Sequence, residues 1–344
     1  MKLSDFNYNL QKKQIAEYPL DKRDEARLLV LNRENNSIDH KTFKDVADYF
    51  HKGDVVVVNE SRVFQARLFG NKEKTQAKIE VFLLRELNHK DAIWDVIVDP
   101  ARKVRIGNKI YFSDTLWCEV IDNTTSRGRT VKFNQNGNIY QAVENIGNTP
   151  LPPYIKRDPE PKDKEYYQTV YAKNDGSVAA PTAGLHFTPE LLQKLKDKGV
   201  QIAPVTLHIG LGTFRPVEVE DLTKHRMDSE FFEITPESAE IINKAIHAGG
   251  NVVAVGTSTV RALETSVTAE GFVRPNKNWT DKFIFPSYSF RVVKSMITNF
   301  HVPQSTLLML VCAFAETEIV MKAYKAAAKE NYRFLSYGDA MLIL

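Results

Sequence analysis

Three histidines stand beside short apolar segments in the C-terminal half of the chain, where a side chain can reach a cleft. His186 lies in APTAGLHFT, His208 in TLHIGLGTFRP and His301 in ITNFHVPQST. Imidazole gains and loses a proton near neutral pH, so each of the three is a candidate for general acid–base catalysis. A lone histidine at a strand end is more often a hydrogen-bonded structural residue, and this alternative applies to each of them singly.

A helix start suited to anions is predicted in the segment VGTSTVRALE, which begins at Val255. An apolar strand is followed there by a glycine turn and a helix rich in hydroxyl groups. The free N–H groups of such a helix start bind carboxylate or phosphate, and a nearby guanidinium adds charge-assisted hydrogen bonds. We therefore expect Thr257, Ser258 and Arg261 to hold an anionic group of a substrate, with a simple salt bridge as the alternative role of Arg261.

Small and polar residues of the histidine segments extend the predicted binding site. Gly210 and Gly212 would let a flat ligand approach the backbone closely. This pair lacks the third glycine and the following helix of a dinucleotide-binding motif, which we therefore reject. Ser305 or Thr306 is expected to cap a helix. The predicted substrate-binding residues of these segments are Gly210, Gly212, Thr213, Arg215, Asn299 and Ser305.

The residue pattern does not predict a metal site. The chain has neither an H-E-x-x-H motif nor clustered carboxylates, so we expect no catalytic metal. The G-x-S-x-G and P-loop motifs are missing too. Cys118 and Cys312 are far apart and form no C-x-x-C pair, which argues against a disulfide framework and a cysteine-rich zinc site.

Strands alternate with helices from about residue 178 onward, which favours an α/β architecture with parallel strand pairs. The valine run at residues 55–58 predicts a buried strand. Residues 61–147 instead contain short strands separated by turn residues, a pattern typical of a small β-barrel or sandwich. The predicted fold is an α/β main domain built from both chain ends, residues 1–60 and 148–344, with a small β-barrel domain inserted at residues 61–147.

The charges indicate one basic region. The chain has 46 Lys and Arg against 43 Asp and Glu, a formal charge of +3 that alone does not argue for nucleic-acid binding. Residues 61–110 contain 11 Lys or Arg and 6 Asp or Glu, and such a patch attracts phosphate. The N-terminus lacks the apolar run of a signal peptide and no stretch is apolar enough to cross a membrane, so we expect a cytoplasmic protein.

The same segments, in the same order, resemble the S-adenosylmethionine:tRNA ribosyltransferase-isomerases of queuosine biosynthesis. The resemblance extends through nearly the whole chain, and each motif is moderately specific. Besides the segments described above, the matching motifs are IAEYP from Ile15, NESRV from Asn59, PARK from Pro100, LPPYI from Leu151, YQTVY from Tyr167 and YRFLSYGDAML from Tyr332.

The resemblance implies a reaction on tRNA whose anticodon wobble position bears an aminomethyl-deazaguanine. The ribosyl group of S-adenosylmethionine would be transferred to the amine and rearranged to an epoxy-cyclopentanediol, giving epoxyqueuosine in tRNA with release of adenine and methionine. S-adenosylmethionine would be a consumed co-substrate, with no further cofactor or metal and no obligatory protein partner. The modified base would leave its stack, and Phe187, Phe214 and Tyr337 are candidates to stack on it, although each of them taken singly is more often a core aromatic residue.

Within that reaction, we expect His208 and His301 to supply the base and acid functions, with His186 as a third candidate. The tRNA would lie over basic residues that follow the valine strand, and its affinity would depend on salt. The predicted tRNA-binding residues are Arg62, Arg67, Arg102, Lys103 and Arg105.

Three positions depart from the family pattern, which usually has Arg at Tyr166, His at Asp228 and Lys at Gln304. Fewer basic groups near the predicted cleft leave two alternatives open. One is an RNA-binding module without catalysis, which would bind tRNA without releasing adenine. The other is an S-adenosylmethionine-dependent enzyme that acts on a small deazapurine instead of tRNA.

Overall fold

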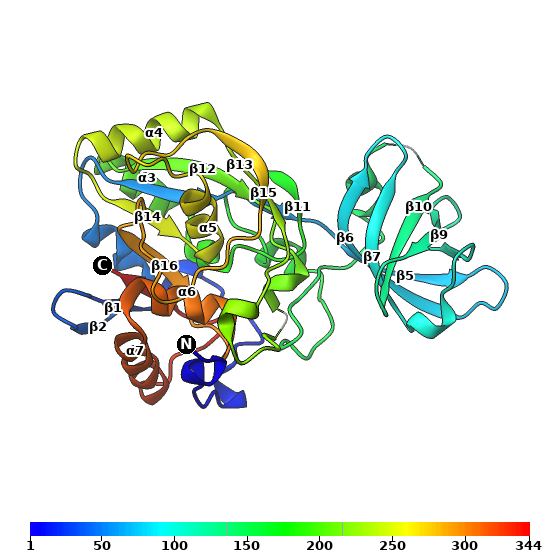
Figure 1. Ribbon diagram of the computed structural model, residues 1–344, viewed down its shortest axis with the longest axis horizontal. Coiled ribbons are helices and arrows are strands. Elements are labelled where there is room, and N and C mark those ends of the chain that lie inside the picture. Colours follow the sequence, from blue (N-terminus) through cyan, green and yellow to red (C-terminus); the bar gives the residue numbers. More distant parts are fainter. Residues whose placement is uncertain (136, 215) are drawn as a thin grey trace.

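The computed structural model describes residues 1–135, 137–214 and 216–344 of the chain. It contains a large α/β body and a separate β-barrel, joined by extended segments (Figure 1). Within the described residues, the main sheet has nine strands. In spatial order they are β15 (Asn276–Thr280), β13 (Glu230–Ile234), β12 (Gln201–Leu207), β3 (Val55–Asn59), β14 (Val252–Val255), β16 (Ser295–Asn299), β17 (Ala340–Ile343), β1 (Arg27–Leu31) and β2 (Ile38–Thr42).

The valine strand β3 lies in the middle of this sheet and is buried on both faces, as its sequence predicts. It pairs in parallel with β12 on one side and with β14 on the other. Its side chains alternate between two cores, because successive residues of a strand point to opposite faces. Val55 and Val57 belong to the larger core, whereas Val56 and Val58 belong to the smaller one.

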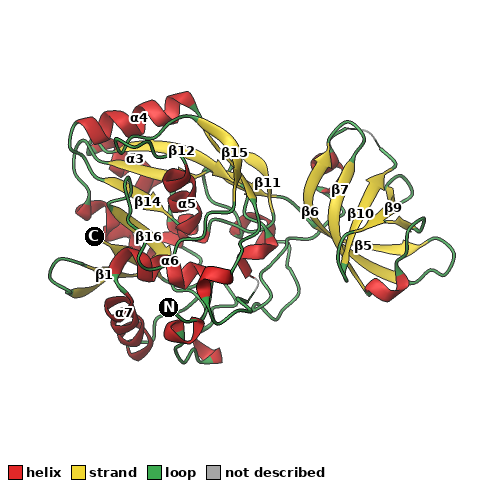
Figure 2. Cartoon of the chain, viewed as in Figure 1, coloured by secondary structure: helices red, strands yellow, loops and turns green. Residues whose placement is uncertain are grey.

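Helices cover both faces of the sheet, as the cartoon in Figure 2 shows. Helices that follow β13, β14 and β16 pack into the larger core, while the helix before β12 packs into the smaller one beside the 3-10 helix Phe43–Tyr49. The longer helices are α3 (Pro189–Asp197), α4 (Pro236–His247), α5 (Thr257–Thr265), α6 (Thr306–Ala315) and α7 (Thr317–Lys329).

Both chain ends contribute to the main sheet. Strand β1, near the N-terminus, pairs in parallel with β17, the last strand of the chain. Strand β17 also pairs with β16 in the antiparallel sense. This confirms the predicted α/β domain built from the two ends of the chain.

The inserted segment forms a closed barrel of six strands in the described part of the chain. Trp94, Val96 and Val98 alternate into its core and are fully buried. Closure removes the exposed strand edges of a small sheet. The inserted β-barrel is thereby confirmed. Around the barrel the strands are β10 (Gly128–Phe133), β7 (Ile93–Asp99), β6 (Lys78–Asn88), β5 (Arg67–Lys72), β8 (Lys109–Tyr111) and β9 (Trp117–Asn123).

Short elements connect the two parts. Strand β4 (Ser61–Val63), which leads from the main sheet into the barrel, pairs in parallel with β11 (Asn174–Ser177), which comes after the barrel in the chain. The segments before and after the barrel are therefore hydrogen-bonded to each other. The short helices α1 (Ile139–Val143) and α2 (Asp163–Tyr166) follow the barrel. Among the helices of the described residues, we find none with the length and apolar character needed to span a membrane.

Candidate active site

A pocket opens at the carboxyl ends of β14 and β16 in the main sheet. These two strands are parallel neighbours, so the segments that follow them meet at one edge. In α/β sheets, this edge is where ligands bind. The pocket has about 750 Å³ of space, which includes open solvent at its mouth. Its walls include Ala180–Ala183, Gly256–Ser258, Thr298–Val302, Leu335 and Ser336.

The start of α5 forms one wall of this pocket. Gly256 precedes the helix with φ +88°, a conformation that residues with a side chain rarely adopt. The chain can therefore turn directly from β14 into the helix, and the first N–H groups of α5 lie at the pocket. Thr257 and Ser258 line the wall, and the Ser258 hydroxyl accepts a hydrogen bond from Asn59 Nδ2 at 3.1 Å; their anion-binding role stays a prediction.

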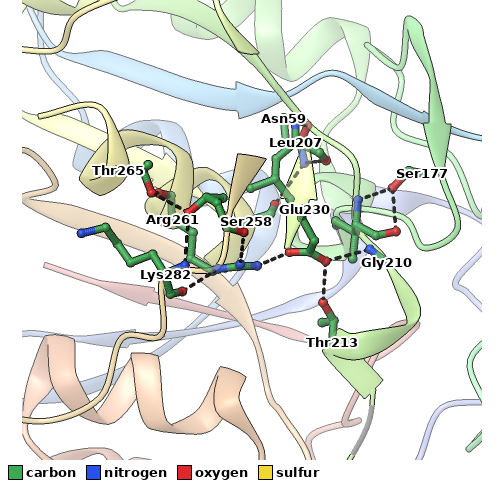
Figure 3. A network of polar contacts seen from close by, with 12 residues as sticks. Asn59, Ser177, Leu207, Gly210, Thr213, Glu230, Ser258, Arg261, Thr265 and Lys282 are labelled. Carbon is green, nitrogen blue, oxygen red and sulfur yellow. Dashed lines mark hydrogen bonds and ion pairs between the residues drawn. The ribbon is translucent and has the colours of Figure 1, made fainter. Parts of the chain in front are cut away.

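A buried ion pair forms part of the pocket lining beside that helix. Arg261 Nη1 pairs with Glu230 Oε2, and both side chains are only 4% exposed (Figure 3). Arg261 also donates from Nε to the carbonyl of Lys282 at 3.0 Å. The structure therefore shows the salt bridge that the sequence left as an alternative for Arg261, while the anion-binding role stays a prediction.

Glu230 also fixes the glycine-containing segment that follows β12. Its Oε1 accepts from the backbone N–H of Gly210 at 2.7 Å and from the hydroxyl of Thr213 at 3.0 Å (Figure 3). One carboxylate thus joins this segment to Arg261 of α5. Gly212 approaches Asp228 so closely that a Cβ there would lie 2.5 Å from Asp228 Oδ2. The predicted binding residue Arg215 lies outside the described residues.

His301 lines the same pocket. Its Nε2 lies 2.7 Å from Thr298 Oγ1, and its backbone N–H donates to the hydroxyl of Tyr324 at 3.1 Å. Burial lowers the pKa of His301 to about 3. The imidazole is therefore neutral at pH 7 and can accept a proton, whereas it can act as an acid only after it has gained one.

Asn299 connects the pocket to His186. Thr182 donates to Asn299 Oδ1 at 2.9 Å, and Asn299 Nδ2 lies 3.4 Å from His186 Nε2. His186 itself lines a smaller adjacent pocket that also includes Tyr166. Burial lowers the pKa of His186 to about 4, and its ring packs 5.0 Å from that of Phe43. His186 thus does not line the main pocket and is connected to it through Asn299.

His208 lies in a different pocket, between the main sheet and the barrel. Its Nδ1 is 2.8 Å from Ser61 Oγ, and its ring stacks on Phe231 with 5.4 Å between centroids. A Cβ on Gly176 would lie 2.6 Å from His208 Nε2, so only glycine fits there. Burial lowers the pKa of His208 to about 4.

The structure therefore does not bring His208 and His301 into one pocket, although the two pockets touch. Ile209 and Glu230 line both of them. The pocket with His208, which we call the interdomain pocket, is further lined by Leu84, Arg85, Glu86, Asp95, Tyr140, Gly176, Gly210–Gly212, Asp228, Ser229, Phe231 and Trp279. The pocket with His301 is called the main pocket below.

Ser305 caps α6, as the sequence predicts. Its hydroxyl accepts from the N–H of Leu308 at 3.2 Å and donates to the carbonyl of Val302 at 2.8 Å. The neighbouring Gln304 has φ +57° and donates its N–H to the carbonyl of Phe6. The contacts of Ser305 are those of a cap, and its substrate-binding role stays a prediction.

The predicted tRNA-binding residues fall into two groups. Arg62 pairs with Asp175 at 3.2 Å, and Arg67 pairs with Glu80 at 3.1 Å, both near the junction of the two domains. The other three, Arg102, Lys103 and Arg105, are exposed on the barrel after β7. Their side chains are accessible to a large polyanion.

Sequence reasoning missed Glu230, Asn59, Ser61 and Trp279. Glu230 begins β13, a strand that the sequence did not lead us to predict. In the structure its residues EFFEI alternate between buried and half-buried positions. Asn59 and Ser61 are part of the NESRV motif, which matched the family but did not show that these side chains contact Ser258 and His208. The described residues contain no group of three or more His, Cys, Asp or Glu side chains arranged to hold a metal ion.

A largely apolar pocket with a few polar groups beyond the carboxyl ends of parallel strands defines the chain as an α/β protein with a ligand-binding site of the usual kind. A family model described as queuosine biosynthesis protein matches residues 3–343. The chain is 59% identical over 345 residues to the S-adenosylmethionine:tRNA ribosyltransferase-isomerase of Chloroherpeton thalassium and 56% identical over 348 residues to that of Cytophaga hutchinsonii, with 100% of each chain covered.

A solved structure agrees with these relatives. The crystal structure of the S-adenosylmethionine tRNA ribosyltransferase from Thermotoga maritima is 35% identical, with a TM-score of 0.57 over 99% of this chain and 100% of the other. The chain belongs to the queuosine biosynthesis protein family. The resemblance given by the sequence motifs is confirmed.

Proposed function

We propose that the protein transfers the ribosyl group of S-adenosylmethionine to an aminomethyl-deazaguanine at the wobble position of tRNA and rearranges it. The products would be epoxyqueuosine in tRNA, adenine and methionine. The observation that supports this best is the pair of adjoining pockets with Glu230 in their common wall. A reaction between a small nucleoside and a base of a large RNA needs two such sites that meet.

In this proposal, S-adenosylmethionine occupies the main pocket. Its methionine carboxylate would lie at the start of α5, where the N–H groups and the hydroxyls of Thr257 and Ser258 can hold an anion. The main pocket has more apolar than polar wall, including Ala179, Ile209 and Leu307, which suits an adenine ring. No additional cofactor is needed, because the sulfonium itself activates the ribosyl group.

The tRNA would approach from the barrel side. The interdomain pocket lies between the barrel and the main sheet, and the exposed Arg102, Lys103 and Arg105 extend the contact surface along the barrel. The wobble base would leave its stack and enter the interdomain pocket beside His208. Its aminomethyl group would then face the ribosyl group across Glu230. We place the reaction in the cytoplasm, where tRNA is modified.

The imidazoles are uncharged at the outset, and we assign one of them the role of proton acceptor. The sulfonium acidifies the adjacent ribose carbon, and a neutral histidine can remove that proton. Burial lowers the pKa of His301 to about 3 and that of His208 to about 4, so both are neutral in the free protein. A histidine that has accepted the proton becomes an imidazolium, which can then donate to the departing adenine.

Adenine release tests the proposal. The protein is incubated with S-adenosylmethionine alone, with tRNA bearing guanine, and with tRNA bearing the aminomethyl-deazaguanine. The proposal predicts adenine and methionine in equal amounts with the modified tRNA only. Tight binding of the modified tRNA without adenine release would instead indicate an RNA-binding module, and release with the free deazapurine would indicate a small-molecule enzyme.

A further inference from the structure

An aromatic pair, with one exposed and one partly buried ring, lines the interdomain pocket. Trp279 of the edge strand β15 is 46% exposed, an unusual exposure for the largest apolar side chain. Phe231 of β13 is its directly opposed partner in the sheet, and their ring centroids are 5.9 Å apart. Phe231 in turn stacks on His208. An aromatic series therefore extends from the surface to the histidine of the pocket.

The indole of Trp279 is only loosely covered by the barrel. Arg85 of β6 places its guanidinium carbon 5.7 Å from the indole centroid. By comparison, Arg27 lies 3.9 Å from the ring of Tyr332 in a close stack. The long distance between Arg85 and the indole suggests room for another planar group against the ring. The guanidinium could then stack on that group.

The charges of the pocket select a base over a phosphate. Its wall has four carboxylates, Glu86, Asp95, Asp228 and Glu230, against one guanidinium, Arg85. Glu230 pairs with Arg261 and Asp95 lies 3.7 Å from Arg85, so the remaining acidic excess is what repels the RNA backbone. The same carboxylates favour a base with a positively charged aminomethyl group. Lys277, on the same strand as Trp279, lies outside the pocket lining and is exposed, but it pairs with Glu233 at 3.2 Å, so a phosphate there would have to compete with that carboxylate.

We infer that Trp279, supported by Phe231, is a stacking platform for a nucleobase of the tRNA anticodon loop beside His208. Base–aromatic stacking is a general mode of recognising unstacked bases. The inference rests on the proposed function, since an RNA substrate is what brings a base to this pocket. Phe187 and Tyr337, two of the aromatics predicted for this role, are buried in the cores of the main domain. The side chain of Phe214, the third, lies outside the described structure.

The experiment compares Trp279→Leu and Trp279→Phe with the unchanged protein. The ligand is an anticodon stem-loop RNA with the aminomethyl-deazaguanine, and affinity is measured by fluorescence polarisation together with KM for S-adenosylmethionine. Trp279→Leu keeps an apolar side chain but removes the aromatic face, so the RNA Kd should rise about 5- to 100-fold. Trp279→Phe should recover most of the affinity, and KM for S-adenosylmethionine should change less than about twofold.

Trp117→Leu is the matched control. This barrel tryptophan also lies beneath a cation, with Lys109 Nζ 4.6 Å from its ring, but it lines neither of the two pockets. Its RNA Kd should stay unchanged. An unchanged Kd in Trp279→Leu, or equal losses in the Leu and Phe variants, would overturn the platform. Because RNA binding is measured without turnover, missing adenine release in the unchanged protein would overturn the proposed function and leave the platform to be judged by binding.

Discussion

Glu230 and Arg261 form an ion pair in which both side chains are 4% exposed, at the wall shared by the main and interdomain pockets. The carboxylate also accepts from Gly210 and Thr213. The pair thus joins β13, the segment after β12, and α5. Its position makes it the structural connection between the two proposed substrate sites.

Removing one member of this pair should strongly destabilise the fold. In Glu230→Gln, the guanidinium of Arg261 stays buried without its counter-charge, and breaking such a buried pair costs about 3 kcal/mol or more. The free energy of unfolding from urea titration measures this loss. Glu240→Gln is the control, because Glu240 pairs with Lys244 on the exposed face of α4 and its loss should cost below about 1 kcal/mol. Equal effects of the two substitutions would refute this role of Glu230.

Stability should fall as the pH drops from 7 to 5. The pKa of His208 is about 4 and that of His301 about 3 in the folded protein, because both are buried, whereas the pKa of an unfolded histidine is near 6.5. The unfolded chain therefore binds more protons in this interval, and unfolding becomes easier. Each imidazole should contribute ~2 kcal/mol of the loss at pH 5.

The contribution of His208 can be isolated by substitution. In His208→Gln, urea unfolding at pH 7 and pH 5 should show a smaller difference than in the unchanged protein. A pH dependence that is identical in the His208 variant would show that this imidazole titrates equally in both states.

Both pocket histidines should be needed for turnover. His301→Ala and His208→Ala should each lower kcat for adenine release about 100-fold or more, the usual loss when a general acid or base is removed. His247, exposed at the end of α4, provides the control, and His247→Ala should keep full activity. Near-normal kcat in either pocket variant would remove that histidine from the proposed proton transfer.

The barrel should contribute to tRNA affinity through its exposed cations. Arg102→Ala and Lys103→Ala should each weaken binding and lower the slope of log affinity against log salt by about 1. Arg62→Ala should change the slope less, because its guanidinium already pairs with Asp175. Filter binding at four salt concentrations measures the slopes. If the Arg102 and Lys103 variants keep the unchanged slope, the tRNA does not lie over this part of the barrel.

The elements of the fold follow from local sequence patterns. The valine run of β3 forms the buried strand that its sequence predicts, and Ser305 caps a helix where the sequence places it. The inserted barrel was predictable because short alternating strands separated by turns have few other solutions. Each of these elements is indicated by residues that are neighbours in the sequence.

The site depends on contacts between distant segments, which local patterns do not determine. His208 and His301 stand in similar motifs, yet the order of the strands directs one to the barrel side and the other to the end of β16. The partner of Arg261 comes from β13, and Trp279 lies in the polar segment NKNWT, whose composition gives no strand signal. The positions of these residues therefore became visible only in the folded chain.

The ribosyl group, and not the methyl group, of S-adenosylmethionine should pass to the modified tRNA. S-adenosylmethionine labelled in the ribose carbons, in adenine or in the methyl group is incubated in separate reactions with the protein and the modified tRNA, and the label in recovered tRNA is counted. Ribose label should appear in tRNA, with adenine and methyl labels left in the small-molecule fraction. Methyl label in tRNA, or no ribose label there, would refute transfer of the ribosyl group.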